Sequence, residues 1–297
     1  MNCVHDDSFL LELEEVNPLL MEKPLPPGLH VVATPIGNLG DLSPRAAETL
    51  RSADRILAED TRVTAKLLAH IGAKVPMSRY DDHSGDAERE RIVATLGNEA
   101  VALVSDAGTP LISDPGYKLV RAARAAGFAV HTVPGPSAAV AALTLSGLPT
   151  DRFLFVGFLP AKPKARRDAI GEIAAIRATL VLYESGPRLG DCLASLTERL
   201  GPREAAVVRE ISKLHEECVT GTLAELAERY SNTAPKGEIV IVVGPPAEAP
   251  QASDAELDAA LDQALKHLSP SRAAAEVAER LNLPRKRAYT RALERSR

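Results

Sequence analysis

One loop constrains the fold of this chain more than any other stretch. The apolar run Val101–Val104 turns abruptly polar, and the stretch Leu103–Gly116 reads LVSDAGTPLISDPG. Short apolar runs bounded by turn residues are typical of buried strands. The next segment is rich in helix formers, with Leu119, Val120 and Ala123 at helical spacing. The loop is therefore expected at the carboxyl end of a strand and ahead of a helix, where open α/β sheets bind ligands, although any such connection needs Gly, Pro and Asp to turn.

The same alternation of strand and helix extends along most of the chain. The expected strands span 29–33, 54–58, 75–80, 101–104 and 128–133, and helices follow them over 43–52, 61–71, 87–96, 116–126 and 138–145. Such alternation predicts a mostly parallel sheet. The alternation pauses at 146–151 and resumes with shorter expected strands at 153–159, 179–183, 204–209 and 238–244. We therefore expect two consecutive α/β domains.

The domain organisation follows from these patterns and from changes in composition. We expect a mobile acidic extension at 1–28, an N-terminal α/β domain at 29–148, a C-terminal α/β domain at 149–245, a Pro-rich linker at 246–252 and a basic helical tail at 253–297. From Ser269 on, the tail carries eight Lys or Arg against three Glu, in a pattern of helix-turn-helix type. It is either a nucleic-acid-binding unit or a packing or dimerisation appendage with a solvated charged face.

Composition limits the possible functions. Aromatic residues make up 3% of the chain and Trp is absent, which argues against a protein that stacks single-stranded bases on aromatic platforms. The net charge of −5 gives no general attraction to nucleic acid or anionic membranes, so local basic patches would have to hold such partners. Neither the three cysteines nor the seven histidines have metal-ligand spacing, and we expect no metal.

The expected location is the cytoplasm. The three cysteines form no even framework and indicate a reducing compartment. No apolar run approaches the ~18 residues that span a bilayer, and the layout of a signal peptide is missing. The loop Gly37–Gly40 does not match the glycine pattern of dinucleotide binders, and neither a P-loop nor a G-x-S-x-G elbow occurs.

Eight collinear motifs carry a resemblance to a known family. They are VATPIGNLGDLSPRA, AEDTRVTAKLL, VSDAGTPLISDPG, VPGPSA, FVGFLPAK, LYESGPRL, VVREISKLHEE and KGEIVIVVGP. This set, from Leu29 to about Gly244, is similar to the tetrapyrrole-methylase superfamily. It looks like the branch that methylates small-subunit (16S) ribosomal RNA at a cytidine 2′-hydroxyl.

The resemblance implies that S-adenosylmethionine binds in a cleft between the two α/β domains. It also implies a homodimer that acts on ribosomal RNA, within the 30S subunit. Carried onto this sequence, the cofactor-binding residues are Ser105, Asp106, Ala107, Gly108, Thr109, Pro136, Ser137, Ala138, Phe158, Leu159, Tyr183, Glu238, Ile239 and Ile241. Small residues and exposed backbone suit an adenine edge and a methionyl group, and a carboxylate suits a sulfonium.

The implied reaction is an in-line methyl transfer to a ribose hydroxyl. Positioning alone can contribute about 7–11 kcal/mol in well-oriented pairs, and a general base would assist because a 2′-hydroxyl is a weak nucleophile. The candidate catalytic residues, chosen by their place at strand ends, are Glu59, Asp60, Arg62, Glu184, Glu210, Lys213 and Glu216. For any single one of them, a salt-bridged charge at the rim is the more common role.

Local positive charge supports an RNA substrate. The candidate RNA-binding residues are Arg62, Lys162, Lys164, Arg166, Arg167, Arg188 and Lys213. Such residues can hold phosphates despite the net negative charge. Two alternatives stay open: a small-molecule tetrapyrrole methyltransferase of the same superfamily, because tetrapyrroles are polyacids, and a nucleic-acid-binding regulator that uses the basic tail.

Overall fold

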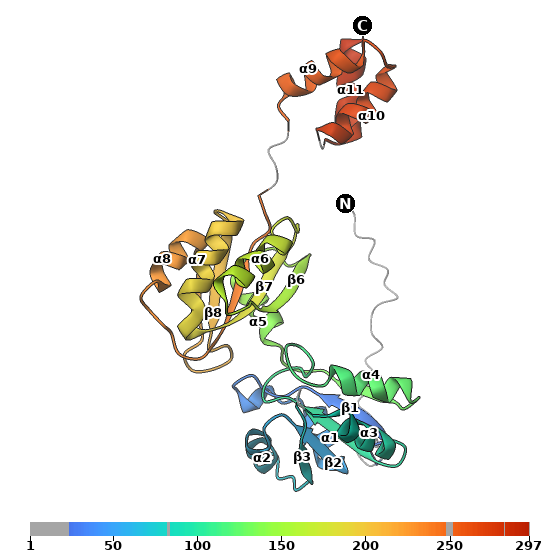
Figure 1. The fold of residues 1–297 in the computed structure, drawn as a ribbon, viewed down its shortest axis with the longest axis vertical. Helices are drawn as coiled ribbons and strands as arrows, with labels where there is room; N and C mark the ends of the chain where they lie inside the picture. Colours follow the sequence, from blue (N-terminus) through green and yellow to red (C-terminus); the bar gives the residue numbers. More distant parts are fainter. Residues whose placement is uncertain (1–23, 82–83, 248–251, 282, 297) are drawn as a thin grey trace. The chain divides into compact units, whose positions relative to one another are not determined.

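The computed structural model describes residues 24–81, 84–247, 252–281 and 283–296 (Figure 1). Its contacts divide the chain into two compact units, Met1–Pro245 and Pro246–Arg297. Most of the expected N-terminal extension (1–23) and part of the expected linker (248–251) lie outside the described residues. A division of the first unit at 148/149 stays a prediction.

The first sheet has five strands in the order β3-β2-β4-β1-β5. The strands are β1 (Gly28–Val32), β2 (Arg55–Ala58), β3 (Met77–Arg79), β4 (Ala100–Val104) and β5 (Val130–Val133). Every neighbouring pair in it is parallel, which confirms the predicted mostly parallel sheet. The central strand β4 is buried along its whole length, as its uninterrupted apolar run predicts.

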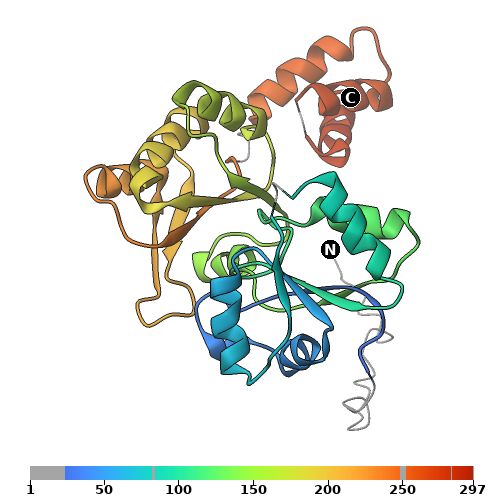
Figure 2. The same cartoon turned by 60° about the horizontal axis from the view of Figure 1, so that its bottom comes forward.

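Helices cover both faces of this sheet (Figures 1 and 2). They are α1 (Pro44–Ser52), α2 (Thr61–His70), α3 (Asp86–Thr95) and α4 (Tyr117–Ala125), with a short 3₁₀ turn at Leu39–Asp41. Ala102 and Val104 pack with α1 and α2, whereas Val101 and Leu103 pack with α3 and α4. This division follows from the two-residue period of a strand. The predicted helix start is also confirmed, because the Ser43 side chain accepts a hydrogen bond from the Ala46 N–H.

The second sheet is mixed, with the order β6-β7-β10-β8-β9. Its strands are β6 (Phe153–Phe158), β7 (Thr179–Ser185), β8 (Glu204–Arg209), β9 (Glu217–Thr222) and β10 (Glu238–Val243). Only β6 and β7 pair in parallel, and β10 runs antiparallel to both β7 and β8. Glu238, the first residue of β10, pairs with Ser185, the last residue of β7. The start of β10 therefore lies at the same edge as the carboxyl ends of β6, β7 and β8.

The strand β9 was not expected from the sequence. Its segment ECVTGT is short, contains a glycine and has no apolar run. Pairing with the whole length of β8 keeps it in place, so the tertiary context overrides a weak local preference.

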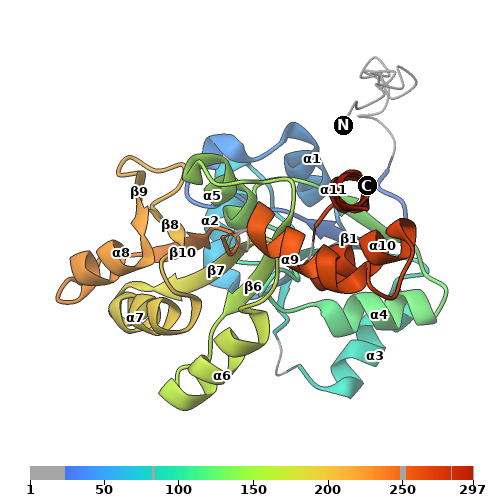
Figure 3. The same ribbon diagram turned by 90° about the horizontal axis from the view of Figure 1, so that it is seen from above.

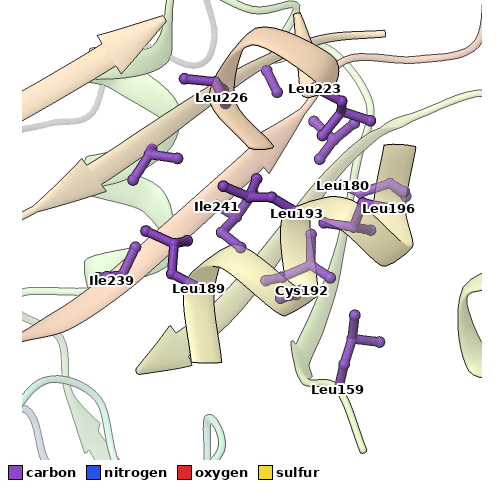
Figure 4. Packing of buried hydrophobic residues seen from close by; sticks show 14 of the residues in the cluster. Leu159, Leu180, Leu189, Cys192, Leu193, Leu196, Leu223, Leu226, Ile239 and Ile241 are labelled. Carbon is purple, nitrogen blue, oxygen red and sulfur yellow. The ribbon is translucent and has the colours of Figure 1, made fainter. Parts of the chain in front are cut away.

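The helices α6 (Pro163–Ile173), α7 (Leu189–Leu200) and α8 (Leu223–Tyr230) cover one face of this sheet, and α5 (Ala138–Ser146) covers the other (Figure 3). Figure 4 shows the hydrophobic core between the sheet and the first three of these helices, where Leu180 and Ile241 contact Leu193 of α7. On the opposite face, Val181 and Val240 pack against α5. Since α5 directly follows the first sheet's last strand and packs on the second sheet, it joins the two α/β halves.

The second unit is a small three-helix domain. It consists of α9 (Asp254–Ala264), α10 (Pro270–Arg280) and α11 (Arg285–Arg295), packed around alanine and leucine side chains. The predicted capping box of Ser253 and Glu256 is present at the start of α9. These features confirm the expected helical unit at the carboxyl end. Across the described part of the chain, no helix is both long and apolar enough to span a membrane.

Candidate functional site

A cleft opens where the edges of the two sheets meet in the first unit. The space between its walls is about 1030 Å³, including space open to solvent. Ten of the expected cofactor residues line it: Asp106, Ala107, Gly108, Thr109, Ser137, Ala138, Phe158, Tyr183, Glu238 and Ile239. Loops from both halves of the unit therefore meet at one cavity, as expected.

Four expected cofactor residues do not line this cleft. Leu159 and Ile241 are 3% and 0% exposed, and their side chains belong to the core under α7 (Figure 4), so their assignment to the cofactor stays a prediction. Ser105 is buried below the loop, where its backbone carbonyl accepts a hydrogen bond from the Thr34 hydroxyl at 3.2 Å. Pro136 borders a neighbouring groove instead.

The loop after β4 is locked to its neighbours by backbone bonds. Thr34 and Gly108 exchange two N–H to carbonyl hydrogen bonds of 2.9 and 3.1 Å, and the Thr109 hydroxyl donates to the Pro136 carbonyl at 3.1 Å. Gly108 has a φ of 81°, and a Cβ there would lie 3.4 Å from the Ile36 side chain. Glycine thus suits this point in both backbone conformation and space.

Strained backbone is concentrated at the cleft. Among the described residues, the non-glycine positions with positive φ are Leu111, Ser113, Glu210 and Ser212, at 74°, 64°, 51° and 65°. The first two lie in the loop after β4 and the others in the loop after β8, and both loops line the cleft. Such conformations cost roughly 1–3 kcal/mol each and persist where the surroundings impose them, most often at functional sites.

Acidic side chains dominate the lining. Within the part of the chain that the structure describes, the cleft is lined by Glu59, Asp106, Asp114, Glu184, Glu210 and Glu238, against the single cation Lys213. Burial, together with the neighbouring carboxylates of Glu59, Glu238 and Asp106, raises the pKa of Asp114 to about 6, and a hydrogen bond with Ser105 opposes the shift. Burial also raises the pKa of Asp106. This arrangement favours a cationic ligand.

Asp114 is a second carboxylate of the central loop, and the sequence alone indicates no role for it. Its SDPG context is that of an ordinary turn before a helix. Two of the carboxylates around it, Glu59 and Glu238, come from other strands, so no local pattern could reveal its full environment.

Asp60 and Arg62 form a structural pair at the start of α2. The Asp60 carboxylate accepts the Arg62 N–H at 2.8 Å and pairs with the Arg62 guanidinium at 2.5 Å. These bonds with Arg62 lower the pKa of Asp60 to about 2. This argues against Asp60 as a base. The backbone N–H of Asp60 also donates to Asp106 at 3.0 Å, which ties α2 to the central loop.

Two further candidate bases are engaged in the structure. Glu184 is 1% exposed, accepts the Ser185 N–H at 2.8 Å and lies 3.2 Å from the Arg188 guanidinium. Glu216 borders the neighbouring groove and accepts the Ser212 N–H at 2.7 Å. Both carboxylates hold loops in place, and a catalytic role for either stays a prediction.

The loop after β8 connects the two α/β halves beside the cleft. The Lys213 ammonium lies 3.0 Å from the Glu210 carboxylate, and the Lys213 stem packs where Gly37 has no side chain. The Ser212 hydroxyl donates to the carboxylate of Asp41. Lys213 and Glu210 are therefore in the cleft, as expected.

The expected RNA-binding residues divide into exposed and structural ones. Lys162 and Lys164 are exposed at the start of α6, and the side chain of Arg62 is 86% exposed. Arg166 is 5% exposed and donates to the Ser195 hydroxyl at 3.0 Å, so its assignment to RNA binding is wrong. The helical period explains this result, because one position in the first turns of α6 must face the core.

Two other cations are partly exposed. Arg167 lies on the same helix at intermediate exposure. The side chain of Arg188 is 33% exposed and donates to the Leu159 carbonyl at 2.6 Å. Among the described residues, no group of three or more His, Cys, Asp or Glu is arranged to hold a metal ion.

Comparisons with known proteins agree with this geometry. The model of the Tetrapyrrole (Corrin/Porphyrin) Methylases matches residues 28–227, and that of the RsmI C-terminal HTH domain matches residues 251–296. A curated relative, ribosomal RNA small subunit methyltransferase I of Erythrobacter litoralis, is 58% identical over 92% of this chain and 96% of its own length.

Two solved structures of one enzyme share the fold. Uroporphyrin-III-C-methyltransferase from Thermus thermophilus is 26% identical over 73% of this chain and 93% of that one, with a TM-score of 0.53. Its complex with S-adenosyl homocysteine is 24% identical over 73% and 96%, with a TM-score of 0.50. Both matched regions and the identity over nearly a whole relative lead to one conclusion: this chain belongs to the tetrapyrrole methylase family, in the branch of the ribosomal RNA small subunit methyltransferases I.

Proposed function

We propose that this methyltransferase uses S-adenosylmethionine to methylate the 2′-hydroxyl of a cytidine in small-subunit ribosomal RNA. The observation that carries the proposal is an acidic cleft, formed by both α/β halves, in a chain of the ribosomal RNA methyltransferase branch. The reaction needs a site for a cationic methyl donor next to a surface that holds an RNA phosphate backbone.

The cleft residues fit this cofactor. Bound S-adenosylmethionine supplies a methyl group on a positively charged sulfonium. The carboxylates of Asp106, Asp114 and Glu238 give the cleft the opposite charge. Phe158 is 52% exposed and contacts the edge of Tyr183, with ring centroids 5.6 Å apart, so an aromatic wall is available to an adenine ring.

Asp114 is the proton acceptor in this proposal. A new bond forms between the ribose O2′ and the methyl carbon, the bond from that carbon to sulfur breaks with its electron pair going to sulfur, and the O2′ proton passes to the Asp114 carboxylate. A base is most effective when its pKa lies near the working pH. Asp114 combines partial burial in the cleft with a pKa of about 6.

Other charged residues of the cleft have supporting roles in this proposal. Glu59 and Glu210 contribute to the negative potential, and Lys213 lies beside Glu210, where it can contact an incoming phosphate. On the outer surface, Arg62 and Lys164 are exposed cations that can bind the RNA backbone.

We also propose that the enzyme is a homodimer in the cytoplasm, where its substrate resides. Leu214 is 92% exposed, and Val140 and Leu145 of α5 are 52% and 37% exposed. Exposed apolar side chains of this kind are typical of an interface. Sedimentation equilibrium of the wild-type protein and of Leu214→Glu measures the oligomeric state directly. A wild-type protein that sediments as a monomer would exclude the dimer.

The test of the function is a methyl-transfer assay with labelled cofactor. The protein is incubated separately with 30S subunits, with ribosomal RNA freed of protein and with a tetrapyrrole precursor. Label in ribosomal RNA, at a cytidine 2′-oxygen by nucleoside analysis, is the expected result. Transfer to the tetrapyrrole alone would replace the proposal with the activity of the Thermus thermophilus enzyme.

A further inference from the structure

Three arginines of α11 are used to hold the small helical unit together. Arg287 lies 2.8 Å from Asp254, Arg291 makes two bonds of 2.7 and 2.8 Å to Asp258, and Arg295 pairs with Asp262. The three arginines are spaced by four residues along α11, and the three aspartates by four residues along α9. One face of α11 therefore pairs with one face of α9, turn by turn. We name these six residues the α9–α11 ladder.

The ladder changes the electrostatics expected of this unit. Residues 252–297 contain nine Lys or Arg and seven Asp or Glu, and the ladder takes three of each. Bidentate pairing of this kind is among the stronger surface interactions. The three ladder arginines are therefore already bound to carboxylates and do not offer free positive charge to RNA.

The ladder also fixes which face of α11 points to solvent. Ala288 and Ala292 are fully buried in the core of the unit. Arg285 and Lys286 are exposed and make no ion pair within the described residues, and Tyr289 is 42% exposed. We name these three residues, one turn of the helix, the α11 face.

The chemistry of the α11 face matches a nucleic acid. Its two cations suit phosphates. Aromatic residues are too scarce in this chain for a stacking platform, but the one exposed tyrosine of this face can stack on a single unpaired base, an interaction worth about 1–3 kcal/mol per base. The acid nearest along the helix, Glu294, is 3.0 Å from Arg291 and belongs to the ladder side. α11 starts at Arg285, shortly after α10 ends at Arg280, and in a helix-turn-helix the second helix is the one that reads nucleic acid.

We propose that the α11 face binds single-stranded or looped ribosomal RNA, whereas the α9–α11 ladder is structural. This inference rests on the proposed function, because it names the surface that holds the same substrate.

The experiment uses the full chain and titrates salt in a ribosomal RNA binding assay. The double variant Arg285→Ala/Lys286→Ala should weaken binding at least tenfold and reduce the slope of log affinity against log salt by about 1.5, since each lost phosphate contact removes roughly 0.7–0.9. The matched control is Arg272→Ala/Arg280→Ala, which removes the same charge from exposed positions of α10. Its loss of affinity should be at least threefold smaller, and equal losses would overturn the proposal.

A second pair of variants separates stacking from charge. Tyr289→Ala should weaken binding at least threefold without changing the salt slope, and Tyr289→Phe should restore it because the ring is kept. Unchanged binding in Tyr289→Ala, or loss of binding to 30S subunits with unchanged binding to protein-free RNA, would overturn the assignment to RNA. The cofactor-induced rise in Tm reports the first unit separately, and a wild-type enzyme that binds RNA but methylates none would contradict the proposed function alone.

Discussion

Replacing Asp114 by Asn should make the free protein more stable and at the same time inactivate it. The Asp114 carboxylate is partly buried in the cleft near Glu59, Glu238 and Asp106, which raises its pKa from 3.8 to about 6. The native state therefore binds a proton more tightly than the unfolded chain does. An Asn side chain keeps an oxygen that can accept the Ser105 hydrogen bond and removes the charge.

The size of the effect follows from the pKa shift. At about 1.4 kcal/mol per pKa unit, a shift from 3.8 to about 6 corresponds to an upper limit of roughly 3 kcal/mol. The wild type loses stability as the pH rises between these two values, because the native state holds the proton longer. Asp114→Asn should thus raise the free energy of unfolding by up to about 3 kcal/mol at pH 8 and by about half of that at pH 5.

The assay combines denaturant unfolding at both pH values with methyl-transfer kinetics. Loss of the proton acceptor should lower kcat by about 10²- to 10⁴-fold, and the wild-type kcat/KM for the cofactor should fall tenfold per unit below pH 6. Asp151→Asn, at an exposed position, is the control and should change neither property. A variant that gains stability but keeps its kcat would refute the catalytic role, and one with unchanged stability at pH 8 would refute the electrostatic reasoning.

Three further changes test the cleft, the RNA surface and the packing. Gly108→Leu should abolish the rise in Tm that the cofactor causes in the wild type, because the position has a positive φ and little space; a preserved shift would mean that the central loop does not hold the cofactor. Lys162→Ala with Lys164→Ala should raise the KM for 30S subunits and flatten its salt dependence while the cofactor affinity is unchanged, and an equal loss of both would place this helix in the cofactor site. Gly186→Ala should destabilise the fold by about 3 kcal/mol or more, since its Cβ would overlap a backbone carbonyl, whereas Gly85→Ala, with open space around it, should have little effect on the denaturation midpoint.

Local patterns in the sequence were sufficient to find most elements, and the family resemblance indicated most of the residues that line the cleft. The apolar run Val101–Val104 became the buried strand β4, and the Ser43 cap became the start of α1. The loops gathered as expected because carboxyl ends of parallel strands share one edge of a sheet. Gly108 and Thr109, which belong to one of these loops, line the cleft at that edge.

The roles of individual side chains depended on contacts that the sequence does not show. Glu59 and Asp60 are neighbours, yet Glu59 lines the cleft whereas Asp60 caps a helix. Arg166 belongs to a basic cluster in the sequence and is buried in the structure. The direction of β10 could not be read from the sequence either. Because β10 runs antiparallel to β7, its first residues reach the cleft, whereas Ile241 lies in the core.

The raised pKa of Asp114 links cofactor binding to protonation. Its neighbours Glu59, Asp106 and Glu238 come from loops of two sheets, so the repulsion among them exists only in the folded protein. A cationic ligand in the cleft offsets this repulsion and lowers the pKa of Asp114. By linkage, deprotonation of Asp114 must in turn strengthen cofactor binding, so that the affinity increases as the pH rises through about 6 and the acceptor is already ionised when the methyl donor is in place. In the proposed mechanism, the same acidic cluster that costs the free enzyme stability prepares both the cofactor site and the base.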